Sequence, residues 1–207
     1  MMKPILFTRK KLVRAAATLV LCLLWLLLVW LALRAAGAAS ALYPSLSLRY
    51  TQPVSPQAAE NARRYAVKNQ EQTPFWPTFW DEAGMEAKAG VATANIDAVR
   101  FYGDPDLAFP TSYLAGNAPG ALDTEGCAVS RGLAHRLWGS EDVLGKAVSL
   151  GGREYLVRGV FGGDSLSALV NTGLLAGEGW RNVELAGQPE GDPRTAAENF
   201  AAASGLG

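Results

Sequence analysis

The stretch Cys127–Phe161, CAVSRGLAHRLWGSEDVLGKAVSLGGREYLVRGVF, holds the residues that decide the fold of this chain. It opens with the apolar run Cys127–Val129, which has the length of a buried strand. Ser130 then offers a hydroxyl that can accept a hydrogen bond from the first turn of a helix. Four apolar residues share one face over the next two helical turns: Leu133, Ala134, Leu137 and Trp138. Gly139 supplies the left-handed residue that ends such a helix, so a strand and a short capped helix are predicted.

The second half of the stretch predicts a β-hairpin. Lys146–Leu150 and Arg153–Phe161 have the composition of strands, and only Gly151 and Gly152 separate them. Two-residue hairpin turns of the primed types need positive φ angles, which glycine adopts without a steric penalty. The paired glycines therefore predict a tight turn between two antiparallel strands.

This order of residues resembles the extracytoplasmic core domain of MacB/FtsX-type ABC transporter permeases. In that family a strand ends in Ser, a helix follows with the pattern Leu-Ala-x-x-Leu-(aromatic)-Gly, and Gly-Lys precedes a hairpin that ends in Val-x-Gly-Val. The matching residues are Ser130, Leu133-Ala134, Leu137-Trp138-Gly139, Gly145-Lys146 and Val157-Arg158-Gly159-Val160. The resemblance is close over this stretch and looser from Phe75 to Ala186, and it implies a fold and no catalytic residue. The alternative is another small α+β domain with a capped helix and a hairpin.

A transmembrane helix is predicted over residues 15–36. The segment Ala15–Leu33 has nineteen residues and no charge, and a helix of that length spans about 28 Å, close to the ~30 Å hydrocarbon core of a bilayer. Five basic residues precede it: Lys3, Arg9, Lys10, Lys11 and Arg14. Because basic flanks stay inside, residues 1–14 are expected to be a cytoplasmic basic tail and the rest extracytoplasmic, as a single-pass protein of the cell (cytoplasmic) membrane.

A cleavable signal peptide is the alternative to this anchor. Ala39-Ser40-Ala41 resembles a signal peptidase site. The apolar segment is longer than the about 7–15 residues of a usual secretory signal, which favours an uncleaved anchor.

The charge and the cysteines of the exported part argue against nucleic acid binding and against an internal disulfide. It contains thirteen basic and nineteen acidic residues, a formal net charge of −6, which is a poor match to nucleic acid, so no nucleic acid partner is expected. Cys22 lies in the apolar segment and Cys127 is the one cysteine after it, so the domain must be stabilised by core burial instead of a disulfide. Cys127 is expected to be a buried, unreactive thiol, with an intermolecular disulfide as the alternative.

The remaining segments complete an α+β prediction: one N-terminal transmembrane helix, then a single mixed or antiparallel sheet domain with helices packed on it. Residues 37–54 are expected to be a linker and residues 55–207 the MacB-like extracytoplasmic domain. Ser55-Pro56 predicts the start of a helix over Gln57–Gln70, in which Glu60 and Arg64 form an i, i+4 pair. Its apolar stripe is small, so it should lie on the surface or against a neighbouring helix: Ala58, Ala62, Tyr65 and Ala66.

Further strands and a last helix follow from local patterns. The aromatic residues Phe75, Trp76, Phe79 and Trp80 indicate a first strand in the core, with a partner or lipid surface as the alternative. Val91–Tyr102 alternates apolar and polar residues, which is typical of a half-buried strand. Gly103–Gly126 has the composition of a long loop. Trp180–Leu185 is predicted as the last strand, and Asp192-Pro193 begins a helix that runs to Ser204 and ends at Gly205.

The sequence predicts no catalytic, cofactor-binding or metal-binding residue, no cofactor, and no enzyme. A triad of Ser130, His135 and Asp123 can be imagined, but Ser130 is explained as a helix cap and has no G-x-S-x-G around it. Asp104 and Asp106 could contribute to a calcium site, but no further regularly spaced acids follow, so turn-forming residues are expected. The pair Gly145-Lys146 is followed by Ala in place of the Ser or Thr of a phosphate-binding loop.

The resemblance implies a permease component, or a fragment of one, of an ABC transporter of the MacB/FtsX type. Its exported domain would couple the cycle of a separate cytoplasmic ABC ATPase subunit to an extracytoplasmic substrate or envelope partner. The implied partners are the membrane, that ATPase and a second permease chain in a homo- or heterodimer. Such permeases carry three further membrane helices after this domain, whereas no second long apolar run lies between Leu33 and Gly207. A membrane-anchored accessory binding module without a transport role is therefore the alternative, and an exported hydrolase is a third class.

Overall fold

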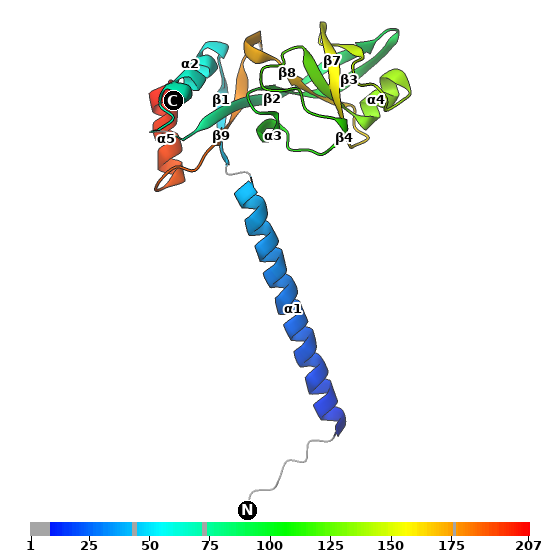
Figure 1. The fold of residues 1–207 in the computed structure, drawn as a ribbon, viewed down its shortest axis with the longest axis vertical. Coiled ribbons are helices and arrows are strands. Elements are labelled where there is room, and N and C mark those ends of the chain that lie inside the picture. The colour runs from blue at the N-terminus through cyan, green and yellow to red at the C-terminus, as the bar shows by residue number, and fades with distance from the viewer. Residues whose placement is uncertain (1–8, 43–44, 72–73, 176) are drawn as a thin grey trace, which may run out of the picture. The chain divides into compact units, whose positions relative to one another are not determined.

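The computed structural model describes residues 9–42, 45–71, 74–175 and 177–207. The chain divides into two compact units, residues 1–44 and 45–207. The first unit contains one helix, α1 (Arg9–Leu42), which is continuous in Figure 1. Within it, Ala16–Arg34 is the one segment of the described chain that is long and apolar enough to cross a membrane, and its side chains are exposed. Residues 1–8 of the predicted basic tail lie outside the described residues.

The second unit is built on a nine-stranded mixed sheet. Its strands are β1 (Ser45–Val54), β2 (Trp76–Ala89), β3 (Ala92–Tyr102), β4 (Tyr113–Gly116), β5 (Gly126–Ser130), β6 (Ala147–Leu150), β7 (Arg153–Phe161), β8 (Ser167–Asn171) and β9 (Trp180–Ala186). Its helices are α2 (Pro56–Lys68), α3 (Pro105–Ala108), α4 (Arg131–Trp138) and α5 (Pro193–Ser204), with a 3₁₀ turn η1 (Gly173–Leu175). The predicted α+β class with a mixed sheet is confirmed.

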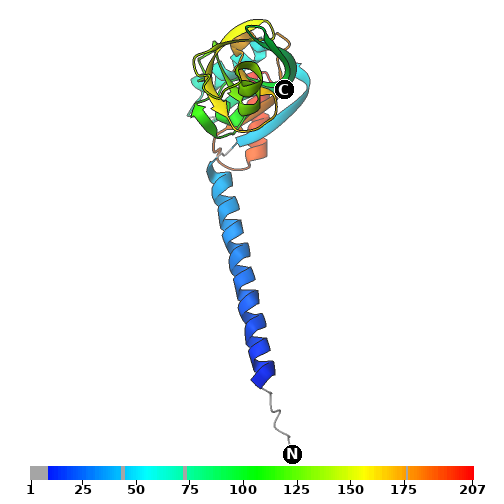
Figure 2. The same cartoon turned by 90° about the vertical axis from the view of Figure 1, so that its right-hand side faces the viewer.

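Part of this sheet closes into a barrel. The strands follow the order β1-β9-β2-β3-β8-β5-β7-β4, and β6 pairs with both β7 and β2. The ring β2-β3-β8-β5-β7-β6 is therefore complete, with parallel pairing between β3 and β8 and between β5 and β7. Closure removes the free strand edges that an open sheet would expose. Figure 2, which faces the α4 end of the unit, shows the strands wrapped around a common axis.

The barrel interior holds the first hydrophobic core, and α4 closes one end of it. Alternate residues of β5 point inward, so Cys127 and Val129 are fully buried in this core. The helix adds three buried side chains: Leu133, Ala134 and Leu137. The predicted caps of this helix are confirmed, because the Ser130 hydroxyl accepts a hydrogen bond of 3.1 Å from the Leu133 N–H and Gly139 has a φ angle of 69°.

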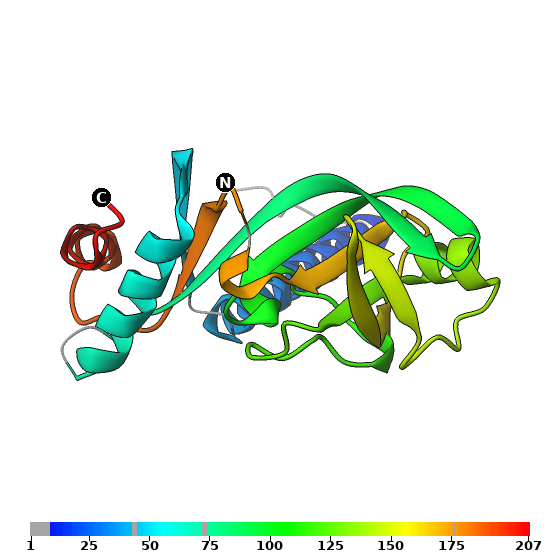
Figure 3. The ribbon, with the colours of Figure 1, turned by 90° about the horizontal axis from the view of Figure 1, so that it is seen from above.

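The other end of the sheet is covered by α2 and α5, which enclose the second core. Small residues of α2 allow it to lie close to its neighbours: Ala59, Ala62 and Ala66 are fully buried. Phe200 of α5 packs edge to face against Tyr65 and Phe75, with ring centroids 5.8 and 5.7 Å apart. Figure 3 shows α2 and α5 side by side, with the β2–β3 hairpin running from them to the barrel. Of the two expected placements of α2, on the surface or against a neighbouring helix, the structure shows contact with α5, and Ala59 is buried in place of the expected Ala58.

A charged pair separates the two cores along the β2–β3 hairpin. Asp81 and Arg100 are directly opposite in the register of the two strands. The Arg100 guanidinium donates two hydrogen bonds to the Asp81 carboxylate, of 3.0 Å from Nε and 2.5 Å from Nη2. Both side chains are largely buried, and they lie between the barrel core and the helix-covered core on the same face of the hairpin. Such two-point pairing satisfies most of the buried charge locally.

The linker expected over residues 37–54 is wrong. Helix α1 continues to Leu42, and residues 45–54 form β1, which pairs antiparallel with β9. The physical reason is that alternate residues of this segment, Leu46, Leu48 and Tyr50, pack against the second core while the residues between them face outward. As an edge strand with Ser, Thr and Pro on its outer face, β1 lacks the apolar density of an inner strand.

The loop expected over Gly103–Gly126 also contains regular structure. It includes the short helix α3, which Asp104 caps, and the edge strand β4. The third core lies beneath it on the outside of the barrel, around Phe101, Phe161 and Leu169. Strand β8 had no predicted counterpart. The expected hairpin, the strands near Val91 and Trp180, and the last helix with its Gly205 cap are confirmed.

Replacing Gly152 by Val should destabilise the hairpin. Gly151 and Gly152 have φ angles of 58° and 86°, and a side chain at Gly152 would meet no atom within 4 Å. The expected cost is therefore backbone strain alone, of ~1–3 kcal/mol, and thermal denaturation should show a melting temperature lower by several degrees. Gly84→Val is the matched control, because Gly84 lies in β2 without positive φ and also has open space around it. Equal melting temperatures for the two variants would contradict the predicted turn strain.

Leu137→Ala should destabilise the domain and His135→Ala should not. Leu137 is buried in the barrel core, so its truncation leaves a cavity that costs ~2–5 kcal/mol. His135 is exposed on the opposite face of α4, where its ring contacts Glu141. Denaturant titration of both variants measures the difference. A large effect at His135 beside a small effect at Leu137 would reverse the assignment of the two helix faces.

Candidate interaction surface

The residues considered for a hydrolase triad engage three different partners. Ser130 is fully buried, and its hydroxyl bonds to the backbone at Leu133, Ser165 and Ser167. His135 contacts Glu141 at 3.1 Å, and Asp123 pairs with Arg158 at 2.8 Å. The structure therefore does not bring Ser130, His135 and Asp123 together, and Ser130 is tied to the end of α4 as a structural residue.

The remaining candidates from the sequence are also structural. Asp104 accepts a hydrogen bond from the Asp106 N–H at 3.0 Å, as the first residue of the α3 turn. The Gly145 N–H bonds to Val157 and the Lys146 N–H to Val143, which places the Gly-Lys pair in the turn before β6. Burial raises the pKa of the Cys127 thiol to about 12, so this side chain stays protonated and unreactive at neutral pH.

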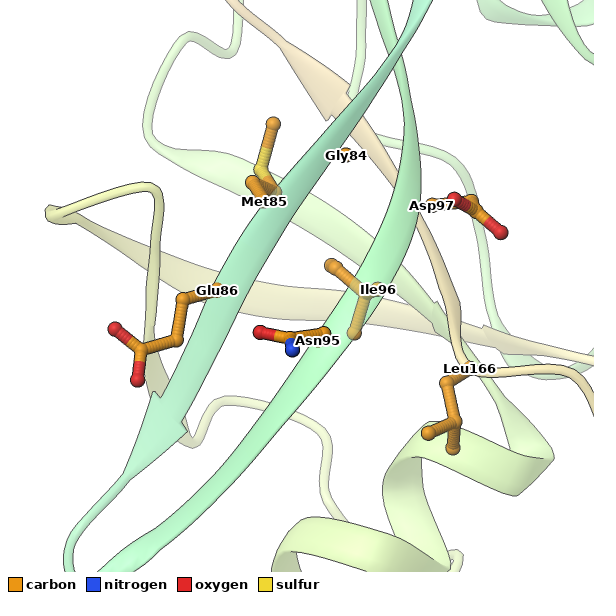
Figure 4. Close-up of a pocket in the computed structure, with 7 residues that line it drawn as sticks. All are labelled: Gly84, Met85, Glu86, Asn95, Ile96, Asp97 and Leu166. Atoms are coloured by element: carbon orange, nitrogen blue, oxygen red, sulfur yellow. The ribbon is translucent and has the colours of Figure 1, made fainter.

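A hollow of about 450 Å³ lies on the β2–β3 hairpin. Figure 4 shows its seven residues: Gly84, Met85, Glu86, Asn95, Ile96, Asp97 and Leu166. In this view the Glu86 side chain points past the edge of β2 and the Asp97 side chain past the edge of β3. Glu86 also pairs with Lys88 at 2.9 Å. The two carboxylates therefore do not converge on one ligand. No group of three or more acidic, His or Cys side chains suited to a metal is found in the described part of the chain.

A second hollow, of about 320 Å³, combines positive charge with apolar surface. It lies beside α2 and is lined by Glu60, Arg63, Arg64, Val67, Lys68, Tyr102 and Leu122. Helix periodicity explains the arrangement, because the small residues of α2 face the second core and leave its charged residues on the outer faces. Leu122 reaches the hollow from the loop that precedes β5 and is almost fully exposed.

Two side chains donate hydrogen bonds to Glu60, the acidic residue that lines this hollow. Tyr102 donates to Glu60 Oε2 at 2.7 Å, and Arg64 donates to Glu60 Oε1 at 2.7 Å. These two bonds hold the pKa of Glu60 below its ordinary value, so the carboxylate is charged at neutral pH and already paired. Burial and the bond to Glu60 raise the pKa of Tyr102, which remains a hydrogen-bond donor.

Two cations of the hollow, Arg63 and Lys68, make no ion pair among the described residues. The Arg63 guanidinium lies over the Tyr102 ring at 4.4 Å and the Trp76 ring at 5.6 Å, so it is held in place by aromatic faces instead of by a carboxylate. Lys68 is exposed at the end of α2 and makes no ion pair within the described residues. Exposed apolar and Arg side chains of this kind are typical of protein interfaces.

Sequence reasoning found the Glu60–Arg64 pair but missed this surface. The spacing of Arg63 with Val67 and of Arg64 with Lys68 on a predicted helix was the available signal, because residues four apart are neighbours on a helix surface. Leu122 could not be assigned to the surface from sequence, since it comes from a loop whose position depends on the barrel.

The comparisons with known proteins concern the fold. No protein-family model and no curated protein matches the sequence. The structure is similar to the extracellular domain of the noncanonic ABC-type transporter YknZ from Gram-positive bacteria, with 18% sequence identity and a TM-score of 0.58, over 78% of this chain and 95% of that chain. It is also similar to the periplasmic region of MacB from Actinobacillus actinomycetemcomitans, with 11% identity and a TM-score of 0.59, over 78% and 84% of the two chains. The predicted MacB-like extracytoplasmic fold is thereby confirmed.

Proposed function

We propose that this chain is a permease component of an ABC transporter of the MacB/FtsX type. The observation that carries the proposal is the MacB-like extracytoplasmic fold directly after a helix suited to cross a membrane. The exported domain couples the cycle of a separate cytoplasmic ABC ATPase to a substrate or envelope partner outside the cell membrane. A second permease chain completes the assembly. Function lies in specific surfaces and not in the fold itself, so the substrate is left open.

The connection between the anchor and the domain supports this coupling role. The chain enters the domain through β1, whose register with β9 pairs Ser45 with Ala186 and Arg49 with Asn182. Between these pairs, the buried Glu184 of β9 accepts hydrogen bonds from Ser47, from Arg49 at 2.8 Å and from Trp80 of β2 at 3.1 Å. Charge-assisted hydrogen bonds, which are stronger than neutral ones, thus tie the first strand after the anchor to β9 and β2.

A membrane-anchored accessory binding module is the second candidate. The exposed cationic and apolar hollow beside α2 favours it, because such a surface binds a partner and does not by itself form a transport path. A solute path across a bilayer needs a bundle of helices or a closed barrel with its lipid-facing backbone satisfied. The two candidates differ in whether an ATPase accompanies the chain.

The orientation can be tested with cysteine reporters. The two native thiols should be silent to a membrane-impermeant maleimide, because Cys22 lies in the apolar helix and Cys127 is buried. Val91→Cys, at a fully exposed position of the β2–β3 turn, should be labelled in intact spheroplasts. Lys3→Cys should be labelled only after lysis. The opposite pattern, or loss of the Lys3 reporter from the mature chain, would show that the N-terminus is not retained in the cytoplasm.

Purification from native membranes tests the permease role. The full chain should carry with it a protein with ABC ATPase motifs, and a preparation freed of that protein should show no ATP hydrolysis above background. The reason is that the printed sequence contains no phosphate-binding loop, since Ala147 follows Gly145-Lys146. Mild detergent extraction, mass spectrometry and a phosphate-release assay measure both results. Recovery without any ATPase would favour the accessory module.

A further inference from the structure

Exposed apolar side chains lie in the hollow beside α2 and on the 3₁₀ turn η1, which adjoins α2. This cluster, called the α2–η1 patch below, consists of Val67, Leu122, Leu174 and Leu175, with 57, 92, 44 and 71% of their surface exposed. Single exposed apolar residues are ordinary. A group of them beside one another is uncommon on a soluble domain and marks an interaction site.

The three segments that carry the patch are fixed to each other. Helix α2 packs against η1. The Asn171 side chain donates to the Gly120 carbonyl at 2.8 Å and accepts from the Gly173 N–H at 3.0 Å, so it holds the loop of Leu122 against η1. Gly173 also lies close to Thr124, because an added Cβ would come within 2.8 Å of its methyl group. The patch is therefore a preformed surface, which lowers the ordering cost of binding.

Its charge is opposite to that of the rest of the domain. The exported part has a formal charge of −6, yet three basic residues, Arg63, Arg64 and Lys68, line the hollow of the patch with one acidic residue, Glu60. Glu71 lies beyond Lys68, where it lines a separate hollow. Arg64 and Tyr102 bond to Glu60 directly, whereas Arg63 and Lys68 make no ion pair among the described residues, so their positive charge is available to an anionic partner. Charge complementarity of this kind selects the partner and speeds its association.

We propose that the α2–η1 patch binds an acidic amphipathic helix of an extracytoplasmic partner protein. The apolar side of that helix covers Val67, Leu122 and the η1 leucines, and its carboxylates meet Arg63 and Lys68. A small ligand held in the hollow of about 320 Å³ would leave Leu174 and Leu175 uncovered, because these exposed leucines do not line it. An amphipathic helix laid in a groove covers both, because its apolar residues recur every three or four positions. This proposal rests on the proposed function, in which the exported domain meets an envelope partner.

In vivo photocrosslinking tests the proposal with the full chain in its native cells. A photoreactive residue at Leu122 should crosslink to one extracytoplasmic protein, and the crosslinked peptide should contain Asp or Glu together with apolar residues at helical spacing. The matched control is Leu144, an exposed leucine outside the patch, at which no such product should form. A crosslinked segment without acidic residues, an adduct to lipid, or an adduct to a second copy of this chain would overturn the proposal.

Charge exchange provides the second measurement. Lys68→Glu should lower the yield of the Leu122 crosslink at least about tenfold, because like charges at an interface repel strongly. Lys146→Glu, the same change at another exposed lysine, should leave the yield unchanged. Replacing the acidic residues of the crosslinked segment by Lys should restore binding to the Lys68→Glu variant. Failure of that exchange to restore the crosslink would also overturn the proposal.

Copurification separates this proposal from the permease role. Lys68 lies outside the membrane segment, so the Lys68→Glu variant should still copurify with any ATPase that the unaltered chain carries. If the unaltered chain carries no ATPase but shows the acidic helical crosslink, the permease role fails and the patch proposal stands. If the ATPase is present and Leu122 gives no protein crosslink, the patch proposal fails alone.

Discussion

The antiparallel pairing of β2 with β3 is the interaction on which the rest of the domain depends. Their register is unbroken from Phe79 opposite Tyr102 to Ala89 opposite Ala92. One face of this hairpin contributes Phe79 and Tyr102 to the helix-covered core and Ala87, Ala94 and Ile96 to the barrel core. A shift of one residue would turn every one of these side chains to the opposite face, so both cores fix the same register. The Asp81–Arg100 pair adds a third constraint between them, since a shifted register would leave a largely buried charge without its partner.

The signals of local structure could be read from the sequence, and the closing contacts could not. Ser130, Gly139 and the glycines at 151–152 act through neighbouring backbone, so their roles in the α4 caps and in the hairpin turn were predictable. Closure of the barrel depends on Ala87 and Leu150, which pair across two distant strands and have no common local pattern. Strand β8 was missed because it is short and its pairing with β3 is parallel, which requires a distant partner. The α2–η1 patch was missed for a related reason, since its residues come from three segments that only the fold brings together.

Two buried polar side chains of the barrel, Ser130 and Cys127, have structural roles. The Ser130 hydroxyl bonds to three backbone groups and holds α4 to the segment after β7. Cys127, the one buried thiol, is kept protonated by its apolar surroundings. A fully bonded hydroxyl and a protonated thiol are poor nucleophiles.

The proposed partner surface and the attachment of the membrane helix act on the same strands. Helix α2, which carries Arg63, Val67 and Lys68, packs on β2, and Trp80 of β2 bonds to the Glu184 carboxylate that also holds Ser47 and Arg49 of β1. A partner bound to α2 and a displacement delivered through β1 therefore both act on the sheet β1-β9-β2. The barrel shares β2 with that sheet, and the β2–β3 hairpin connects the two. In the proposed transporter, the helix-covered end therefore responds to the partner through α2 and to the anchor through β1.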